Sequence, residues 1–333
     1  MLRRPNILVV GSFMMDLIAA TRRAPREGET VVGLRFTTAP GGKGANQAVQ
    51  CARLGAQVTM VGRGGDDAFG RLLTGTAAQA GVDVSHVSVD PEESSGVGHI
   101  TLEVTEHDAR NRITVCPGAN HTLTVEEIAW LREEIGRYDM LLLQLELPMA
   151  VTEAAARWAH EAGVPVMLNP APAAPLSEEL LACVTYLSPN EHEAAALSGH
   201  PIGTEHGADE ADLAAVTAYF LSRGVQNLLV TLGENGSLIA NASGTLRQER
   251  VAMPHVADTT AAGDSFVAAF CTGVTAGLTQ KDALAFASFA AGITVSRMGA
   301  MPSIPTVEEV QALMRERGFR GFDPAMLDAL KGE

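Results

Sequence analysis

Positive charge is scarce in this sequence of 333 residues, which holds 24 Lys and Arg against 39 Asp and Glu and has a formal net charge of −15. Nucleic-acid binding needs a Lys/Arg surface that neutralises backbone phosphates, so the composition argues against a nucleic-acid partner. Any phosphate group that the protein binds must therefore be held by backbone amides, a metal ion and a few local cations.

Cysteine and long apolar runs are also scarce. The four cysteines, Cys51, Cys116, Cys183 and Cys271, are widely separated and form no Cys-x-x-Cys or Cys/His ligand spacing. We expect free thiols in a reducing compartment. The apolar run Ile7–Val10 is too short for a signal peptide, and no stretch approaches the roughly 20 residues that span a bilayer. The sequence therefore predicts a cytoplasmic protein without a membrane partner.

Two common nucleotide-binding motifs are missing. Glycines cluster at Gly41–Gly44 and Gly62–Asp67, but neither cluster has the G-x-G-x-x-G pattern of dinucleotide-binding proteins. The G-x-x-x-x-G-K-[ST] pattern of P-loop proteins is absent from the whole chain. If the protein binds a nucleotide, it does so by another route.

The segment Asp258–Phe266 predicts such a route. The small residues Ala261, Ala262 and Gly263 let the backbone approach a ligand closely, and they precede a predicted helix whose first N–H groups have no intrahelical partner. This arrangement is typical of a phosphate site. A carboxylate beside phosphate makes sense if Asp264 takes a proton from a hydroxyl that attacks the phosphoryl group. The alternative is an ordinary helix cap.

A second segment, Pro40–Ala48, combines glycines with hydrogen-bond donors and opens a helix predicted over Ala45–Leu54. The glycines allow tight backbone approach, and Lys43, Asn46 and Gln47 offer donors. This segment predicts a site for a polar ligand rich in hydroxyl groups.

Alternating strand and helix patterns predict the fold class, an α/β protein with a doubly wound, mainly parallel sheet flanked by helices. Strands are expected at Ile7–Val10, Val58–Val61, Met140–Leu145, Val164–Leu168, Tyr186–Ser188 and Asn227–Thr231. Helices are expected at Phe69–Ala80, after the capping pattern Thr124–Glu127, from Pro148, and at Asn190–Leu197, Asp209–Ser222, Ser265–Ala276 and Lys281–Val295. Gly62–Asp67 is expected to be a loop.

Two regions, about 14–40 and 97–117, differ from this rhythm and predict a small β-sheet lid on one domain that spans residues 1–333. The alternating segments His99–Thr105 and Arg112–Val115 predict a hairpin with a turn at Asp108–Asn111. Strands of this kind cover one face with apolar groups, so the other face must meet a ligand or a second subunit.

The two motifs, in this order, resemble the ribokinase family of sugar kinases. The resemblance runs from Val9 to about Pro305, and it is also carried by Gly65–Asp67, Gln144–Glu146, Asn169–Ala173, Pro189–Asn190, Thr231–Gly233 and Arg297–Ala300. It implies ATP-dependent transfer of the γ-phosphate to the primary (5-) hydroxyl of a pentose, first of all D-ribose. It also implies Mg2+, K+ as an activator, and a homodimer formed through the lid.

The resemblance assigns roles by position. The catalytic group would be Asp264 as base, with the amides of Ala261, Ala262 and Gly263. The sugar would contact Met14, Asp16, Gly41, Gly42, Lys43, Gly44, Asn46, Glu146 and Asp264. ATP would contact Asn190, Thr231, Gly233, Gly236, Gly263 and Ser288. Mg2+ would be held through water by Glu193, and K+ by Asp258, Thr260, Thr294, Arg297, Gly299 and Ser303.

One departure leaves the sugar open. Ribokinases of the best-known bacterial type have Asn two residues before the sugar-binding aspartate, whereas this chain resembles other ribokinases that have methionine there, at Met14. Ribose could then bind through its remaining hydroxyl groups. A thioether is a poor hydrogen-bond partner, so a 2-hydroxyl facing Met14 would lose water without compensation, whereas 2-deoxyribose would bury a methylene there. 2-Deoxyribose is therefore the second candidate sugar. Two further alternatives are a nucleoside kinase, for which the 5% aromatic content offers few residues to stack a base, and a non-catalytic sensor of sugar or nucleotide.

Overall fold

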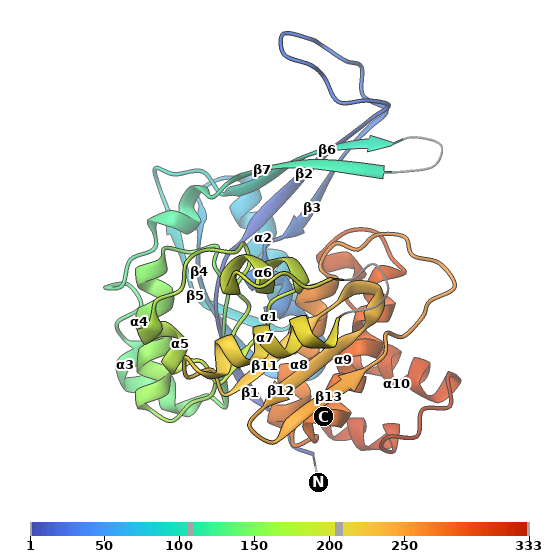
Figure 1. The fold of residues 1–333 in the computed structure, drawn as a ribbon. Coiled ribbons are helices and arrows are strands. Elements are labelled where there is room, and N and C mark those ends of the chain that lie inside the picture. Colours follow the sequence, from blue (N-terminus) through green and yellow to red (C-terminus); the bar gives the residue numbers. More distant parts are fainter. Residues whose placement is uncertain (1, 105–108, 204–208, 332–333) are drawn as a thin grey trace.

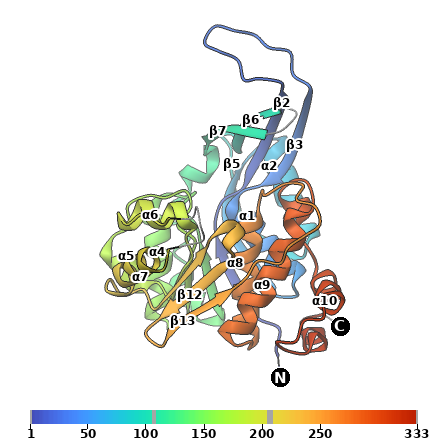
Figure 2. The same ribbon diagram turned by 45° about the vertical axis from the view of Figure 1, so that its right-hand side comes forward.

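Strand β1 (Asn6–Val10) lies between two hydrophobic cores. Its alternate residues Ile7 and Val9 belong to one core, and Leu8 and Val10 belong to the other. Because successive side chains of a strand point to opposite faces, β1 must lie inside a sheet that helices cover on both sides. Figure 2 shows these two helical layers. The computed structural model describes residues 2–104, 109–203 and 209–331.

The central sheet contains nine strands. Besides β1 they are β4 (Gln57–Gly65), β5 (Val82–Asp90), β8 (Met140–Leu143), β9 (Val166–Leu168), β10 (Tyr186–Leu187), β11 (Asn227–Thr231), β12 (Ser237–Asn241) and β13 (Gly244–Gln248). Their order is β13-β12-β11-β10-β9-β8-β1-β4-β5, in which the pairs β11–β12 and β12–β13 are antiparallel and the other pairs are parallel. The predicted mainly parallel sheet is confirmed.

The helices divide between the two cores. One face carries α1 (Lys43–Arg53), α2 (Ala68–Gln79), α8 (Ala262–Ala276), α9 (Gln280–Val295) and α10 (Val307–Glu316). The other carries α3 (Leu131–Glu134), α4 (Met149–Glu161), α5 (Glu178–Cys183), α6 (Glu191–Ser198) and α7 (Glu210–Leu221). Short 3-10 turns are η1 (Gly118–Thr122), η2 (Ile135–Arg137), η3 (Gly233–Asn235), η4 (Met301–Ser303) and η5 (Pro324–Leu330). Within the described ranges no helix is long and apolar enough to cross a membrane.

A second, four-stranded sheet rises from one end of the central sheet (Figure 1). It contains β2 (Met14–Thr21), β3 (Arg35–Gly41), β6 (Gly96–Val104) and β7 (Ala109–Cys116) in the order β3-β2-β6-β7. At its base, the Asn120 amide accepts a hydrogen bond from Phe13 N (2.9 Å) and donates one to Phe13 O (2.8 Å). Because β1 leads directly into β2, this sheet stands over the carboxyl ends of the parallel strands, where α/β proteins bind ligands.

Three local predictions are wrong. Gly62–Gly65 is not a loop, because β4 continues through Gly65 in register with β5. Thr124 and Glu127 exchange the expected hydrogen bonds, but turns follow them and α-helix appears only at Leu131–Glu134. The predicted turn at Asp108–Asn111 is wrong for Ala109–Asn111, because these residues belong to β7; Asp108 lies outside the described residues, as does Thr105 at the end of the predicted first strand.

Candidate active site

The N-terminus of α8 forms the first part of the site. Ala261, which precedes the helix, has a φ of 59° and is the one non-glycine residue in the described part of the chain with a positive φ. A side chain rarely adopts this conformation unless the surroundings impose it, and such residues gather at functional sites. The helix starts earlier than predicted, so Gly263 and Asp264 are its second and third residues. Their N–H groups have no intrahelical acceptor and can meet an anion.

The Asp264 side chain connects the two sequence motifs. It is 6% exposed, and its carboxylate accepts hydrogen bonds from Asn46 Nδ2 (2.8 Å) and Gln47 Nε2 (3.1 Å) of α1. Asn46 keeps its own Oδ1 buried and without a partner among the described residues. Since buried polar atoms are normally satisfied, this oxygen is available to a ligand donor beside Asp264.

A cavity of about 210 Å³ opens on another side of Asp264. Its lining is mostly polar and comes from α1, α6, α8 and the ends of β9, β10 and β11: Lys43, Asn169, Ala171, Ser188, Asn190, Glu193, Thr231, Thr259, Ala261, Gly263, Asp264 and Val267. The structure thus brings together the predicted base, part of the anion loop and three residues predicted to serve ATP and Mg2+. Gly233, Gly236 and Ser288 do not line this cavity.

Carboxylates surround Lys43. Burial lowers the pKa of the Lys43 amine, but Asp264, Glu146, Glu193 and Asp16 together raise it above its ordinary value. Burial also raises the pKa of Glu146, which nevertheless accepts hydrogen bonds from Ser12 Oγ and from Lys43 N (2.9 Å). A permanent cation amid several acids is suited to neutralising phosphate charge as it arrives.

Asp16 lies in the small sheet, on the row Ala39–Asp16–Gly98. A Cβ atom at Gly98 would lie 2.7 Å from Asp16 Oδ1, so only glycine leaves room for this carboxylate. Burial, followed by the charges of Glu146, Asp258 and Asp264, raises the pKa of Asp16 to about 6. In the described part of the chain no group donates a hydrogen bond to it. Asp16 is therefore positioned to accept hydroxyl groups of a ligand.

The glycines of the Pro40–Ala48 segment serve the approach of α1 to β2. Gly42 caps α1 with a φ of 93°, and a Cβ atom there would lie 2.7 Å from Met14 N. Met14 is 4% exposed, and because alternate strand residues share a face, its side chain lies on the same face of β2 as Asp16. Gly41 pairs with Met14 across β2 and β3. The predicted sugar residues of β2, β3 and α1 therefore lie together.

Most of the residues predicted for the nucleotide lie at the start of α6 or at the end of β11 and in the turn that follows it. Asn190 and Glu193 form a capping box, in which Asn190 N donates to Glu193 (2.9 Å) and Glu193 N donates to Asn190 Oδ1 (2.8 Å). Thr231 forms a β-bridge with Asn190. Gly233 and Gly236 belong to the tight turn after β11, where both have positive φ. Ser288 is buried in α9.

The residues predicted for K+ come from the loop before α8, the end of α9 and the turns that follow it, and hydrogen bonds connect three of them. Asp258 accepts hydrogen bonds from Thr260 N (2.9 Å), Thr260 Oγ1 (2.7 Å) and Gly299 N (3.0 Å). The Arg297 guanidinium pairs with Glu309, and Thr294 and Ser303 are fully buried. Among the described residues, no group of three or more His, Cys, Asp or Glu side chains could hold a metal ion. Backbone carbonyls would therefore have to complete a K+ site.

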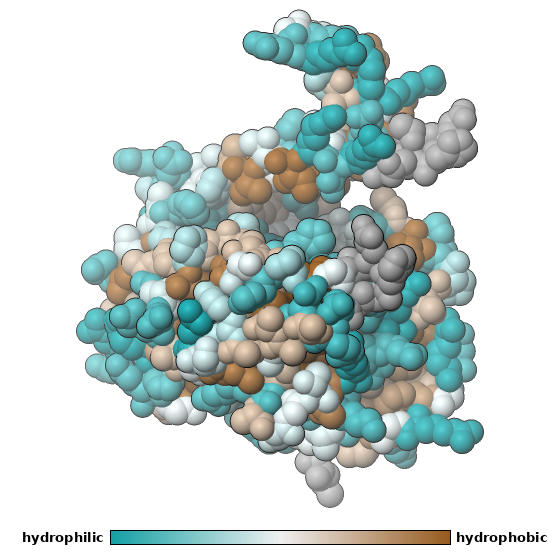
Figure 3. Space-filling view, in the orientation of Figure 1, coloured by the Kyte–Doolittle hydropathy of each residue, from teal (hydrophilic) through white to brown (hydrophobic). Residues whose placement is uncertain are grey.

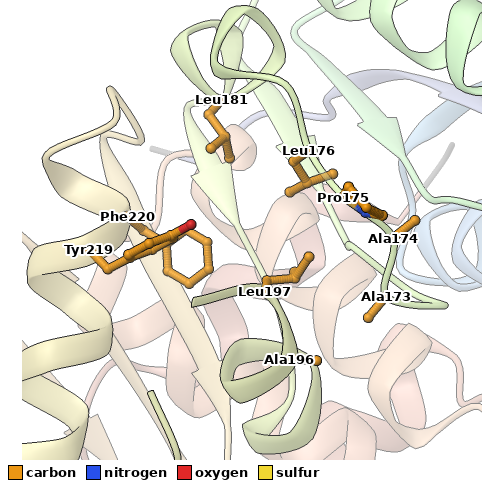
Figure 4. Close-up of a pocket in the computed structure, with 9 residues that line it drawn as sticks. All are labelled: Ala173, Ala174, Pro175, Leu176, Leu181, Ala196, Leu197, Tyr219 and Phe220. Atoms are coloured by element: carbon orange, nitrogen blue, oxygen red, sulfur yellow. The ribbon is translucent and has the colours of Figure 1, made fainter. Parts of the chain in front are cut away.

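A larger cavity, of about 340 Å³, lies elsewhere (Figure 4). Leu176, Leu181, Leu197 and Phe220 contribute most of its apolar wall, and Figure 4 shows them around it with Tyr219. It contains no carboxylate, amine or amide side chain that could do proton or phosphate chemistry. Size alone therefore does not identify the site.

The sequence predicted Gln47 only as a donor to a polar ligand, and it gave Gln144, Asn169 and Ser12 no individual role. Gln47, Gln144, Asn169 and Ser12 form buried hydrogen bonds to one another or to Asp264 and Glu146. Gln144 and Asn169 each follow directly after a strand of the parallel sheet, β8 and β9. That position was the available signal, since the carboxyl ends of parallel strands meet at one edge.

Comparison with known proteins gives a consistent result. The model of the pfkB family carbohydrate kinases matches residues 4–307. A ribokinase of Schizosaccharomyces pombe is 39% identical over 312 residues, which are 92% of this chain and 96% of that protein. A deoxyribokinase of Salmonella typhi is 32% identical over 310 residues, 91% of this chain and 97% of that protein. The structure of Arabidopsis thaliana ribokinase complexed with ribose and ATP is similar with a TM-score of 0.85 at 33% identity, covering 94% of this chain and 99% of that one.

Proposed function

Because this chain belongs to the pfkB family of carbohydrate kinases and is a sugar phosphotransferase, we propose that it transfers the γ-phosphate of ATP to the 5-hydroxyl of D-ribose. One observation carries the proposal. Asp264 is shared by the two halves of the site, since it binds Asn46 of the sugar motif and also lines the cavity that contains Asn190, Glu193 and Thr231. A base between an alcohol and a phosphate is what the reaction requires.

In the proposed reaction the 5-hydroxyl oxygen of the sugar forms a bond to the γ-phosphorus, and the bond from that phosphorus to the oxygen bridging to the β-phosphate breaks. The hydroxyl proton passes to the carboxylate of Asp264, and ADP leaves. The N–H groups of Ala261, Gly263 and Asp264 stabilise charge on the transferred group, whereas Ala262 N donates to the carbonyl of Thr259 (3.2 Å). Lys43 lies where it neutralises phosphate oxygens and keeps the surrounding acids from repelling the nucleotide.

We assign the sugar to the space between α1 and the small sheet. Asp16, with its pKa of about 6, and Glu146 accept hydroxyl groups, and Asn46 Oδ1 supplies a further acceptor. Gly41 lies beside the carboxylate of Asp16, and Gly42 and Gly44 bring α1 close to the backbone of Met14 and Ser12, so that these residues border the space proposed for the sugar. Ribose ranks first because five curated ribokinases are 34% to 39% identical to the chain over more than 90% of its length, whereas the deoxyribokinase is 32% identical.

A second candidate substrate, 2-deoxyribose, is favoured by one residue. Met14 shares the face of β2 that carries Asp16 and offers no hydrogen bond to a 2-hydroxyl. The nucleoside alternative has less support, because the chain is only 5% aromatic and offers few residues that could stack a base in the sugar site. The sensor alternative does not fit a chain in which the base and the anion loop are both present.

Mg2+ and K+ belong to the same proposal. Glu193 offers one oxygen ligand in the cavity, which fits a Mg2+ ion held mainly by ATP phosphates and water. When bound, Mg2+ neutralises charge that develops on the phosphates. Asp258 with the backbone near Thr294, Gly299 and Ser303 provides hard oxygen ligands that fit K+. We assign ATP contacts also to Gly233, Gly236 and Ser288, which lie outside the lining of the cavity.

The small sheet is proposed to act as a lid on a single domain, with the partner's lid packed against it in a homodimer. The cross-strand row Ile18–Ile100–Ile113 lies on the same face of the small sheet as Asp16, two residues farther along β2, and Ile113 is 54% exposed. Figure 3 shows apolar surface where β7 runs in Figure 1. An exposed apolar face of this kind marks an interface. All four cysteines are free thiols, which supports a cytoplasmic location.

The experiment that tests the function is a phosphoryl-transfer assay with ATP and a panel of pentoses, hexoses and nucleosides. Ribose is expected to give the highest kcat/KM. Asp264→Asn should lower kcat by about 10²- to 10⁴-fold and change sugar binding much less. A variant that keeps most of its turnover would show that Asp264 is not the base.

A further inference from the structure

Gln47 is a fully buried amide that touches the proposed base but not the ligand-facing surface. Its exposed fraction is 0%, and it is the fifth residue of α1. Burying an amide is costly unless all of its hydrogen bonds are formed, so such a residue needs a reason beyond packing. Neither cavity described above is lined by Gln47.

Both polar atoms of the Gln47 side chain have hydrogen-bond partners, and these partners fix which atom of the amide faces Asp264. Its Nε2 donates to Asp264 Oδ1 (3.1 Å) and to Asn169 Oδ1 (3.2 Å), and its Oε1 accepts from Gln144 Nε2 (2.7 Å). Asn169 in turn donates from Nδ2 to the carbonyl of Ser188 (2.8 Å). Because a carbonyl can only accept, this chain fixes the orientation of every amide in it, and Gln47 must present N–H to Asp264.

Two neighbouring residues of α1 therefore hold the two oxygens of Asp264. Asn46 donates to Asp264 Oδ2, and its own side-chain oxygen is left without a partner and can accept from a ligand. Gln47 donates to Asp264 Oδ1 and connects this oxygen, through Gln144 and Asn169, to the ends of β8 and β9. One donor would leave the carboxylate free to rotate about its Cβ–Cγ bond. Two donors fix its plane, and so fix which lone pair faces the attacking hydroxyl.

We propose that Gln47 is a positioning residue, which anchors the carboxylate of Asp264 to the carboxyl edge of the central sheet through Gln144 and Asn169, so that this carboxylate is aligned for proton removal. The inference rests on the proposed function. It requires that loss of Gln47 lowers kcat without a matching loss of substrate binding, because Gln47 acts through Asp264 and does not touch the sugar.

The test is Gln47→Met, which keeps the length of the side chain and removes its N–H donors. We expect kcat to fall by about 10- to 100-fold, as for other supporting groups, while the KM values for sugar and ATP change less than about twofold. Gln50→Met is the matched control. Gln50 lies one turn further along α1, is equally buried, and binds Ser265 Oγ (2.6 Å) and Pro305 O (3.1 Å) but not Asp264. Its kcat should stay within about threefold of the wild type.

A double-mutant cycle separates positioning from general damage. In an Asp264→Asn background, Gln47→Met should lower kcat by less than about twofold, because the carboxylate that it aligns is gone. A loss that persists in full in that background, or that Gln50→Met reproduces, would overturn the proposal, as would an unchanged kcat in Gln47→Met.

If Gln47→Met does not fold, Gln144→Met provides the same test one step away. It removes the donor to Gln47 Oε1 and should give a smaller fall in kcat that is again absent in the Asp264→Asn background. A loss of kcat that persists in that background overturns the proposal, as does an unchanged kcat. A wild-type protein that phosphorylates no sugar would overturn the proposed function and this inference together, whereas an active wild type with an undiminished Gln47→Met variant overturns the inference alone.

Discussion

The protonation of Asp16 should control sugar capture near pH 6. Its pKa, ordinarily 3.8, is raised to about 6 by burial and then by Glu146, Asp258 and Asp264. Only the ionised carboxylate accepts hydrogen bonds at both oxygens, so the protonated enzyme should bind sugar hydroxyls poorly. A group with this pKa is about 91% ionised at pH 7 and about 9% ionised at pH 5. The kcat/KM for sugar should therefore fall about tenfold between these values.

The assay is kcat/KM for ribose at saturating ATP from pH 5 to pH 8, because this ratio reports groups of the free enzyme. Asp16→Asn removes the titrating group, so its kcat/KM should be lower throughout and should lack the step that Asp16 causes. Glu193→Gln, on the nucleotide side, should keep the step. A wild-type profile that is flat between pH 5 and 7, or a step of equal size in Asp16→Asn, would refute the assignment.

Four further outcomes are expected. Because the folded-state pKa of Asp16 is raised, Asp16 stabilises the ligand-free protein most below pH 4, and this contribution is lost as pH rises through 6. The Tm of Asp16→Asn should therefore fall less between pH 4 and pH 6 than the Tm of the wild type. Met14→Asn should shift the ratio of kcat/KM for ribose over 2-deoxyribose toward ribose by about tenfold, whereas an unchanged ratio would show that residue 14 does not contact the 2-hydroxyl. Activity should be higher in K+ than in Na+ at equal ionic strength, and equal rates in both salts would count against the Asp258 site. Ile113→Lys should convert a dimer to a monomer in sedimentation at micromolar concentration, while Leu246→Lys, at an exposed apolar residue of β13, should not; a wild-type monomer would remove the lid interface.

The sequence by itself determined the features whose cause is local. The runs Ile7–Val10 and Asn227–Thr231 predict buried parallel strands because they are apolar on both faces, and both strands are present. The small residues before Asp264 predict a helix start open to an anion, and α8 begins there. The glycines of Pro40–Ala48 were identified for the same reason, since close backbone approach follows directly from residue type, whereas the resemblance to the sugar-kinase family identified Met14 and Asp16.

The tertiary structure decided what depends on partners far along the chain. Asn46 and Asp264 are 218 positions apart, and only the packing of α1 against α8 brings them to hydrogen-bonding distance. Pairing with β5 keeps Gly62–Gly65 in a strand although glycines favour a loop. The raised pKa of Asp16 depends on burial and on three carboxylates from two other segments, and the fixed orientation of Gln47 depends on Gln144, Asn169 and Asp264. Local sequence does not encode these effects, because burial, charge and hydrogen-bond direction are properties of the assembled neighbourhood.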